Sequence, residues 1–224
     1  MKRSEINLLV ENAAEFAQSC GFLLPPFAFW SPQEWRSKGP EAREIRDCML
    51  GWDLTDFGSG DFPKIGLIMF TIRNGHLTDT RYSKPYCEKM LISDRKQITP
   101  THFHWSKSED IINRGGGDLA VQVYNSTPDE GLDDSDVTVS VDGTVRTVKA
   151  GDIITLSPGE SIFLPKGMYH KFWGEKARVL LGEVSTVNDD TSDNRFYEQV
   201  GRFPEIEEDE EPRHLLFSEY PRAD

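Results

Sequence analysis

From Ile65 to Val184 the chain consists of short apolar and β-branched segments separated by turn residues. Asn74-Gly75 and Asp142-Gly143 are hairpin signals, because these residue types tolerate the positive φ angles that tight hairpin turns need. Many short strands joined by regular turns are typical of an antiparallel barrel or jelly roll. The expected strands are Ile65–Arg73, Arg81–Ser93, Gln97–Trp105, Leu119–Tyr124, Val137–Val141, Thr144–Val148, Asp152–Leu156, Ser161–Leu164, His170–Trp173 and Val179–Val184.

The first sixty residues have a helical pattern instead. Apolar residues recur at helical spacing after Ser4, which could cap a helix that Gly21 ends. Two short helices are expected to follow, beginning near Pro32 and at Pro40. The apolar run 22–30 is predicted to lie between these helices and the barrel, with a dimer interface as the alternative.

The expected organisation is one structural unit: a helical arm over residues 1–60, and a barrel with a C-terminal closing segment over residues 61–224. Residues 52–57 are expected to form a loop entering the barrel. The polar insert 126–136 is expected to be a solvated surface loop. The acidic tail could pack back onto the protein, because apolar residues interrupt and follow its acids, and one acid could close over the barrel mouth.

Composition narrows the classes of function. A net charge of −13 makes nucleic acid and anionic membranes poor partners. No stretch is apolar enough for a transmembrane helix, and the N-terminus lacks the apolar region of a signal peptide. Three widely spaced cysteines argue against a disulfide framework and fit a reducing compartment. We therefore expect a cytoplasmic protein.

The stretch 101–117 carries the first candidate site. His102 and His104 lie two residues apart, so on a β-strand their side chains point to the same face. Glu109 follows five residues after His104, and the three groups can converge on one ion. The Arg-Gly-Gly-Gly sequence at 114–117 is expected to give a tight reversal.

A second stretch strengthens this interpretation. Residues 159–170 read G-x5-P-x-G-x2-H and end at His170. Together with HxH-x4-E-x6-G at 102–116, they resemble the paired motifs of the cupin superfamily, although Gly174 stands where that family often has Asn. The resemblance implies a cupin-type antiparallel β-barrel. It also implies one divalent metal ion held by His102, His104, Glu109 and His170.

Longer strings are more specific. HFHWSKSEDIINRGGGDL, LPKGMYHKFWGE, EVSTVNDDTSDNRF and RFPEIEEDE together resemble the D-lyxose isomerases, over nearly the whole chain. The resemblance implies a metal-dependent aldose–ketose isomerase that interconverts D-lyxose with D-xylulose and D-mannose with D-fructose. It further implies a cytoplasmic homodimer with Mn²⁺ as the preferred metal. Zn²⁺, Fe²⁺, Co²⁺ or Ni²⁺ would also suit an imidazole-rich site.

Such an isomerase moves a proton between C1 and C2 of a sugar through an enediol. It needs a Lewis acid for the two oxygens, a base for the proton and a donor for the developing oxyanion. Lys107 is the candidate donor, provided that the chain bends near Ser106. The family match at the tail favours Glu205 as the base, and Glu183, at the end of an expected barrel strand, is its rival.

Substrate contacts are predicted from polar residues near these segments. Lys89 is expected to face inward from its strand, while Asp190 and Arg195, with Asn188, could hold sugar hydroxyls. Three other functions compete with a free-sugar isomerase: a phosphosugar isomerase, an Fe²⁺-dependent cupin dioxygenase and a non-catalytic sugar-binding cupin. A phosphosugar substrate would require clustered cations near the metal.

Overall fold

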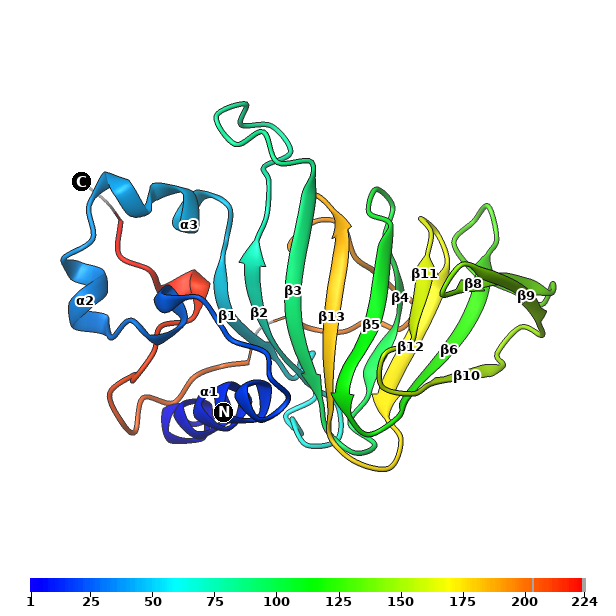
Figure 1. The fold of residues 1–224 in the computed structure, drawn as a ribbon, viewed down its shortest axis with the longest axis horizontal. Helices are drawn as coiled ribbons and strands as arrows, with labels where there is room; N and C mark the ends of the chain where they lie inside the picture. Colours follow the sequence, from blue (N-terminus) through cyan, green and yellow to red (C-terminus); the bar gives the residue numbers. More distant parts are fainter. Residues whose placement is uncertain (203, 223–224) are drawn as a thin grey trace.

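The computed structural model describes residues 1–202 and 204–222, so Phe203 of the tail motif lies outside the described residues. Two curled antiparallel sheets form the body of the protein (Figure 1). The eight-stranded sheet has the order β1 (Gly51–Thr55), β2 (Leu67–Arg73), β3 (Tyr86–Ser93), β13 (Val179–Thr186), β5 (Glu109–Gly116), β11 (Ser161–Leu164), β8 (Val137–Val141) and β9 (Thr144–Val148).

The second sheet has six strands. Its order is β10 (Ile153–Leu156), β6 (Leu119–Ser126), β12 (Tyr169–Gly174), β4 (Thr99–Phe103) and β14 (Arg195–Phe196), and β7 (Leu132–Asp133) pairs with β6. Alternating buried and less buried positions along β8 show one face directed to the core. Apolar side chains from both sheets fill the space between them, which confirms the predicted cupin-type barrel.

Two loop predictions were wrong, and no strand was expected over Glu109–Gly116. Residues 51–55 form β1 rather than a loop, and all five are buried, so the period-two alternation that marks a half-exposed strand is absent. Residues 114–116 continue β5 rather than reversing the chain. The pairing of β5 with β13 shifts register between Leu180 and Leu181, and the glycines allow this irregularity.

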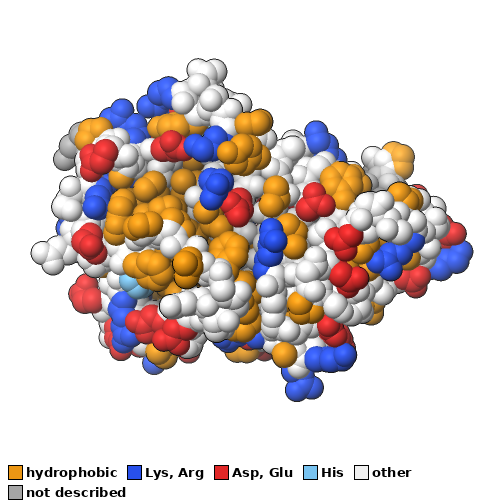
Figure 2. All heavy atoms as spheres, in the orientation of Figure 1, with side chains coloured by type: hydrophobic (Ala, Val, Ile, Leu, Met, Phe, Trp, Pro, Cys, Tyr) orange, Lys and Arg blue, Asp and Glu red, His pale blue; other side chains and the backbone are white. Residues whose placement is uncertain are grey.

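The helical arm packs on the outer face of the large sheet. Its elements are α1 (Arg3–Ser19), the 3₁₀ turn η1 (Pro26–Phe29), α2 (Pro32–Arg36), the 3₁₀ turn η2 (Pro40–Ala42) and α3 (Arg43–Asp47). Ile6, Val10 and Ala13 of α1 share a core with Phe70 of β2 and Met90 of β3. In Figure 2, hydrophobic side chains gather over this side of the molecule. The apolar stripe of α1 therefore packs onto the barrel, as its helical spacing predicts.

The acidic tail folds back onto α1. Asp209 accepts hydrogen bonds from the Ser4 main-chain N–H and hydroxyl, at 2.9 and 2.7 Å. Arg3 is buried and pairs with Glu208 and Glu219. Glu219 is the last residue of the 3₁₀ turn η3 (Phe217–Glu219). Carboxylates at a helix N-terminus are favoured by its unpaired N–H groups and dipole. Asp209 therefore caps the first helix, and Glu208 and Glu219 pair with the Arg3 side chain in its first turn.

The insert 126–136 is not simply a solvated loop. Glu130 accepts hydrogen bonds from Trp105 Nε1 and Arg195 Nε, each at 2.8 Å, and its carbonyl accepts one from the Tyr169 hydroxyl. The insert thereby ties together segments that lie far apart in the sequence. Among the described residues, no helix combines the length and apolar character that crossing a membrane requires.

Gly116 is a position where the barrel leaves no room for a side chain. Its φ angle is +89°, and a Cβ there would lie 2.3 Å from the Arg178 carbonyl oxygen. Gly143 has a similar φ of +75°, with nothing within 4 Å of such a Cβ. We expect Gly143→Ala to lower the free energy of unfolding by about 1 kcal/mol, from backbone strain alone. Gly116→Ala should lower it by about 3 kcal/mol or more, because the strand must also shift.

Urea denaturation of the two variants checks this prediction. Equal losses of stability would contradict the close approach of β5 to the segment before β13.

Candidate metal centre and active site

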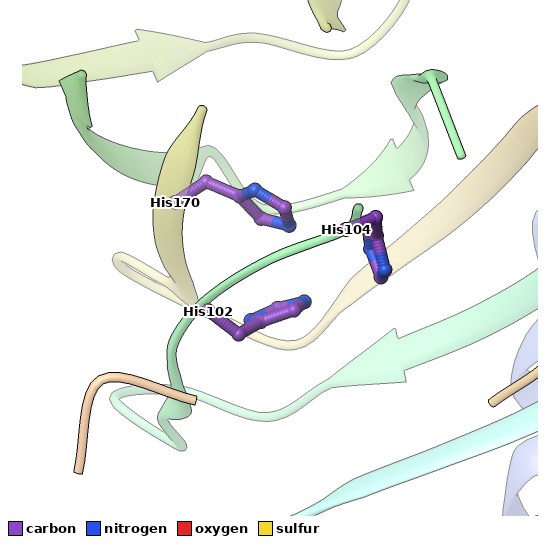
Figure 3. A group of neighbouring side chains, drawn as sticks. All are labelled: His102, His104 and His170. Carbon is purple, nitrogen blue, oxygen red and sulfur yellow. The ribbon is translucent and has the colours of Figure 1, made fainter. Parts of the chain in front are cut away.

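Three histidines meet at one end of the barrel cavity. His102 lies on β4 and is the direct cross-strand partner of His170 on β12, so both side chains leave the same face of the small sheet. His104 follows the end of β4. Their ligand nitrogens all lie within 4.8 Å of one another, and Figure 3 shows the rings converging. The sequence prediction that these histidines come together is confirmed.

Each ring is oriented through Nδ1. The Nδ1 atoms of His102, His104 and His170 lie 2.7, 2.7 and 3.0 Å from the main-chain oxygens of Pro100, Asp193 and Met168. A carbonyl only accepts, so each Nδ1 must carry the proton, and each Nε2 presents a lone pair. Main-chain carbonyls that hold ligand histidines in this way are typical of metal sites.

Glu109, the first residue of β5, completes the group from the opposite sheet. Its Oε1 lies 3.2 Å from His170 Nε2 and 3.5 Å from His104 Nε2. With the rings in this tautomer, the Nε2 lone pairs of His104 and His170 face the Glu109 oxygen, so each of these atoms is an acceptor that faces another acceptor. His170 Nε2 is buried and has no hydrogen-bond donor among the described residues. A cation resolves this arrangement, so the donor set fits a divalent metal ion.

The electrostatics of the group agree with that role. Burial, together with the neighbouring His170 and His104, holds the pKa of His102 well below its usual value, so the ring stays neutral and able to bind a metal ion. Burial alone would raise the pKa of Glu109. The adjacent Lys107 ammonium is the largest opposing influence, and the pKa of Glu109 lies well below its usual value.

A cavity of about 490 Å³, including its mouth, opens beside the histidines. One wall is charged and contains Lys107, Glu183 and Lys89, while much of the remainder is apolar. The other lining residues are Thr55, Phe57, Leu67, Met69, Leu91, Thr99, His102, His104, Glu109, Ile111, Phe172, Asp190, Asn194, Phe196 and Arg202.

The charged wall consists of alternating signs. Lys107 Nζ lies 2.7 Å from Glu109 Oε2 and 2.8 Å from Glu183 Oε1. Lys89 Nζ lies 3.6 Å from the same Glu183 oxygen and 2.8 Å from Asp190 Oδ2. Burial alone would lower the pKa of Lys107, but Glu109 and Glu183 raise it above its usual value. The ammonium is therefore charged at neutral pH.

The bend required for Lys107 is present. Strand β4 ends at Phe103 and β5 begins at Glu109, so residues 104–108 lie outside both ladders. Trp105 and Ser106 are exposed there, whereas Lys107 is only 2 % exposed and lines the cavity.

The remaining predicted residues occupy different places. Asp190 lines the cavity, where Lys89 and Lys107 lower its pKa despite its burial. Arg195 pairs with Glu130 at 2.8 Å and is not among the described residues that line the cavity. The side chain of Glu205 is exposed, and its carbonyl accepts a hydrogen bond from the N-terminal ammonium. In this structure Glu205 therefore lies outside the cavity lining, while Glu183 lies within it.

Sequence reasoning missed several contributors. Arg202 enters the cavity from the tail and pairs with Asp53 of β1 at 2.6 Å. Phe196 stacks on His102, with ring centroids 5.2 Å apart. In the sequence, Phe196 ends the motif EVSTVNDDTSDNRF and Arg202 begins the motif RFPEIEEDE, and nothing else marked either residue. The apolar residues of the tail indicated that it could pack back onto the protein, but no local pattern indicated that Arg202 and Phe196 would line the cavity.

Comparison with known proteins identifies the family. Residues 1–220 match the family model for D-lyxose isomerase. The chain is 47 % identical over 225 residues to the D-lyxose/D-mannose isomerase of Serratia proteamaculans, covering 99 % of both chains. It is also 47 % identical to the corresponding protein of Escherichia coli O157:H7, covering 98 % of each. The chain belongs to the D-lyxose isomerase family.

Solved structures agree on the fold of this isomerase family member. The L-ribose isomerase of Cellulomonas parahominis superposes with a TM-score of 0.61 at 14 % identity, covering 92 % of this chain and 98 % of that one. The L-ribose isomerase of Acinetobacter sp. DL28 gives 0.59 at 14 % identity with the same coverage. At this identity the likeness shows a shared fold.

Metal content tests the donor set directly. His170→Ala removes one of the three buried imidazoles that could hold a metal ion, so we expect purified protein to lose most of its bound divalent metal. His76→Ala is a matched control, because His76 lies in the loop after β2 and its Nδ1 accepts hydrogen bonds only from the local N–H groups of Thr78 and Asp79. Inductively coupled plasma mass spectrometry of both variants measures the outcome. Equal metal content in the two would contradict the site.

Proposed function

We propose that this protein is a metal-dependent aldose–ketose isomerase that converts free D-lyxose to D-xylulose and D-mannose to D-fructose. The observation that carries the proposal is full-length membership of the D-lyxose isomerase family, with curated relatives at 47 % identity. The cavity supports it, because it lies beside the three-histidine group and is lined by paired carboxylates and ammonium groups.

His102, His104, Glu109 and His170 would hold the metal ion, and a divalent ion there would act as a Lewis acid toward two adjacent sugar oxygens. Glu183 would take the proton from C2 of the open-chain aldose and return it to C1. Lys107 and Ser185 both donate to its Oε1, at 2.8 and 3.2 Å, within the described part of the chain. That arrangement orients the carboxylate and leaves Oε2 for the proton.

Lys107 would stabilise the negative charge that develops on the oxygen. Its ammonium has three N–H donors, of which Glu109 and Glu183 take two. The third can donate to the sugar oxygen as C2 loses its proton. Lys89 and Asp190, bound to each other and lining the same wall, would receive the remaining hydroxyls.

The charges of the cavity favour a free sugar over a phosphosugar. Lys107, Lys89 and Arg202 are the cations among the described lining residues, and each pairs with a carboxylate. A phosphate dianion needs several charge-assisted hydrogen bonds, and cations that are already paired with carboxylates would supply them poorly. Family membership likewise favours isomerisation over oxygen chemistry or sugar storage.

A substrate panel tests the function. Mn²⁺-loaded protein should form D-xylulose from D-lyxose and D-fructose from D-mannose, and a chelator should abolish both reactions. Mannose 6-phosphate should turn over far more slowly than mannose. Absence of ketose formation from every free aldose would falsify the proposal, and oxygen consumption with Fe²⁺-loaded protein would favour a dioxygenase instead.

Two substitutions can decide whether Glu183 or Glu205 is the base that carries the proton. Glu183→Gln keeps the shape of the cavity but removes the base, so we expect kcat to fall about 10²-fold or more, with metal content retained. Glu205→Gln should leave kcat near that of the unaltered enzyme, because the Glu205 side chain is exposed. Exchange of the C2 hydrogen of D-lyxose with solvent deuterium, followed by NMR, reports the same step. The opposite ranking of the two variants would return the role to Glu205.

We further propose Mn²⁺ as the physiological metal, a cytoplasmic location and a homodimer. The dimer proposal is supported by exposed apolar side chains of the arm, where Leu23 is 78 % and Phe29 is 50 % exposed. Leu23→Glu should then shift the molar mass measured by light scattering from dimer to monomer. The same substitution at Leu77, which is 57 % exposed in the loop after β2, serves as control.

A further inference from the structure

The segment between β4 and β5 must hold His104 and Lys107 in place without the support of a strand ladder. Residues 104–108 belong to neither strand, yet this segment carries His104, which is 5 % exposed, and Lys107, which is 2 % exposed. Outside a ladder, the main-chain N–H groups must find other acceptors when they are shielded from water. Without such acceptors, the bend that turns Lys107 inward would not be fixed.

Asp193, in the segment between β13 and β14, supplies those acceptors. Its Oδ1 accepts from the Ser106 N–H at 2.8 Å, and its Oδ2 accepts from the Lys107 N–H at 2.9 Å. The carbonyl of the same residue lies 2.7 Å from His104 Nδ1. Asp193 is itself only 6 % exposed. One residue therefore contacts the segment at three points: the His104 ring and the main-chain N–H groups of Ser106 and Lys107.

We propose that Asp193 is a positioning residue that sets both the ring of His104 and the inward direction of Lys107. Hydrogen bonds from adjacent N–H groups to one carboxylate fix the local backbone, and ionised acceptors make such bonds short and strong. With that backbone fixed, Ser106 faces out and Lys107 faces Glu109 and Glu183. The carbonyl holds His104 in the Nδ1-protonated tautomer, with Nε2 directed to the centre.

This inference rests on the proposed function for its kinetic consequence, although not for its structural one. Asp193 touches neither substrate nor the reacting atoms in the arrangement described above. It acts through His104 and Lys107, so both metal affinity and turnover should respond to it.

Asp189 offers a matched control in the same loop. Its carboxylate also accepts local hydrogen bonds, from the Thr191 N–H and from the hydroxyls of Thr191 and Ser192. These bonds stay within the loop and do not reach the segment 104–108. A general loosening of the loop would therefore affect Asp189 and Asp193 variants alike.

The test compares Asp193→Asn, Asp193→Ala and Asp189→Asn in the full-length protein. Asparagine has the same shape as aspartate but only one acceptor oxygen, so it cannot bind both N–H groups. We expect the Kd for Mn²⁺, measured by equilibrium dialysis, to rise about 10–100-fold in Asp193→Asn. Asp189→Asn should stay within about 2-fold of the unaltered protein. With D-lyxose, kcat should fall more than KM changes in Asp193→Asn, because Lys107 acts on the developing charge.

Amide hydrogen exchange gives a readout that does not depend on activity. The N–H groups of Ser106 and Lys107 should exchange at least about 10-fold faster in Asp193→Asn than in Asp189→Asn, because the shared acceptor is lost. This measurement can still be made if Asp193→Ala fails to fold, because the comparison uses the isosteric variant Asp193→Asn.

Unchanged exchange and unchanged Mn²⁺ affinity in Asp193→Asn would overturn the inference. So would equal losses in the Asp193 and Asp189 variants, which would show only a structural role for the loop. If the unaltered protein isomerises no sugar but the exchange and metal results follow expectation, the proposed function fails while the positioning role stands.

Discussion

A row of buried charges of alternating sign organises the cavity. It runs from Glu109 through Lys107, Glu183 and Lys89 to Asp190, with N–O separations of 2.7 to 3.6 Å. Buried charges are costly unless each has a partner, so loss of one member leaves its neighbours uncompensated. The members come from β3, β5, β13 and the segments before β5 and β14. Their mutual pairing therefore fixes these elements relative to one another and gives the metal centre its charged wall.

The returning tail is the second element on which the site depends. After β13 the chain crosses back to the barrel mouth, where Asp190, Asn194, Phe196 and Arg202 line the cavity. Arg202 is held by Asp53, whose pKa burial raises although the guanidinium opposes the effect. The tail then runs to the N-terminal helix and caps it. The first and last segments of the chain thus stabilise each other at a distance from the chemistry.

Much of the barrel could be predicted from the sequence because its signals are local. The hairpin from β8 to β9 follows from alternating residues around Asp142-Gly143, and its bounds were as expected. The grouping of His102, His104 and His170 could also be predicted, because strand periodicity and motif spacing can be read directly from the order of residues in the chain. Strand β1 was missed because both of its faces are buried, which removes the period-two pattern.

The sequence by itself determined the fold class, the family and the histidine donors, because these depend on residue types at fixed spacings. Only the tertiary structure decided that Glu183 lies within the cavity while the Glu205 side chain is exposed, and that Asp193 and Arg202 reach the site. These placements depend on how the tail crosses two packed sheets. That path is set by burial and by contacts between residues 86 to 149 positions apart, such as the hydrogen bond from the Lys107 main-chain N–H to Asp193 and the ion pair of Arg202 with Asp53. No local pattern encodes these contacts.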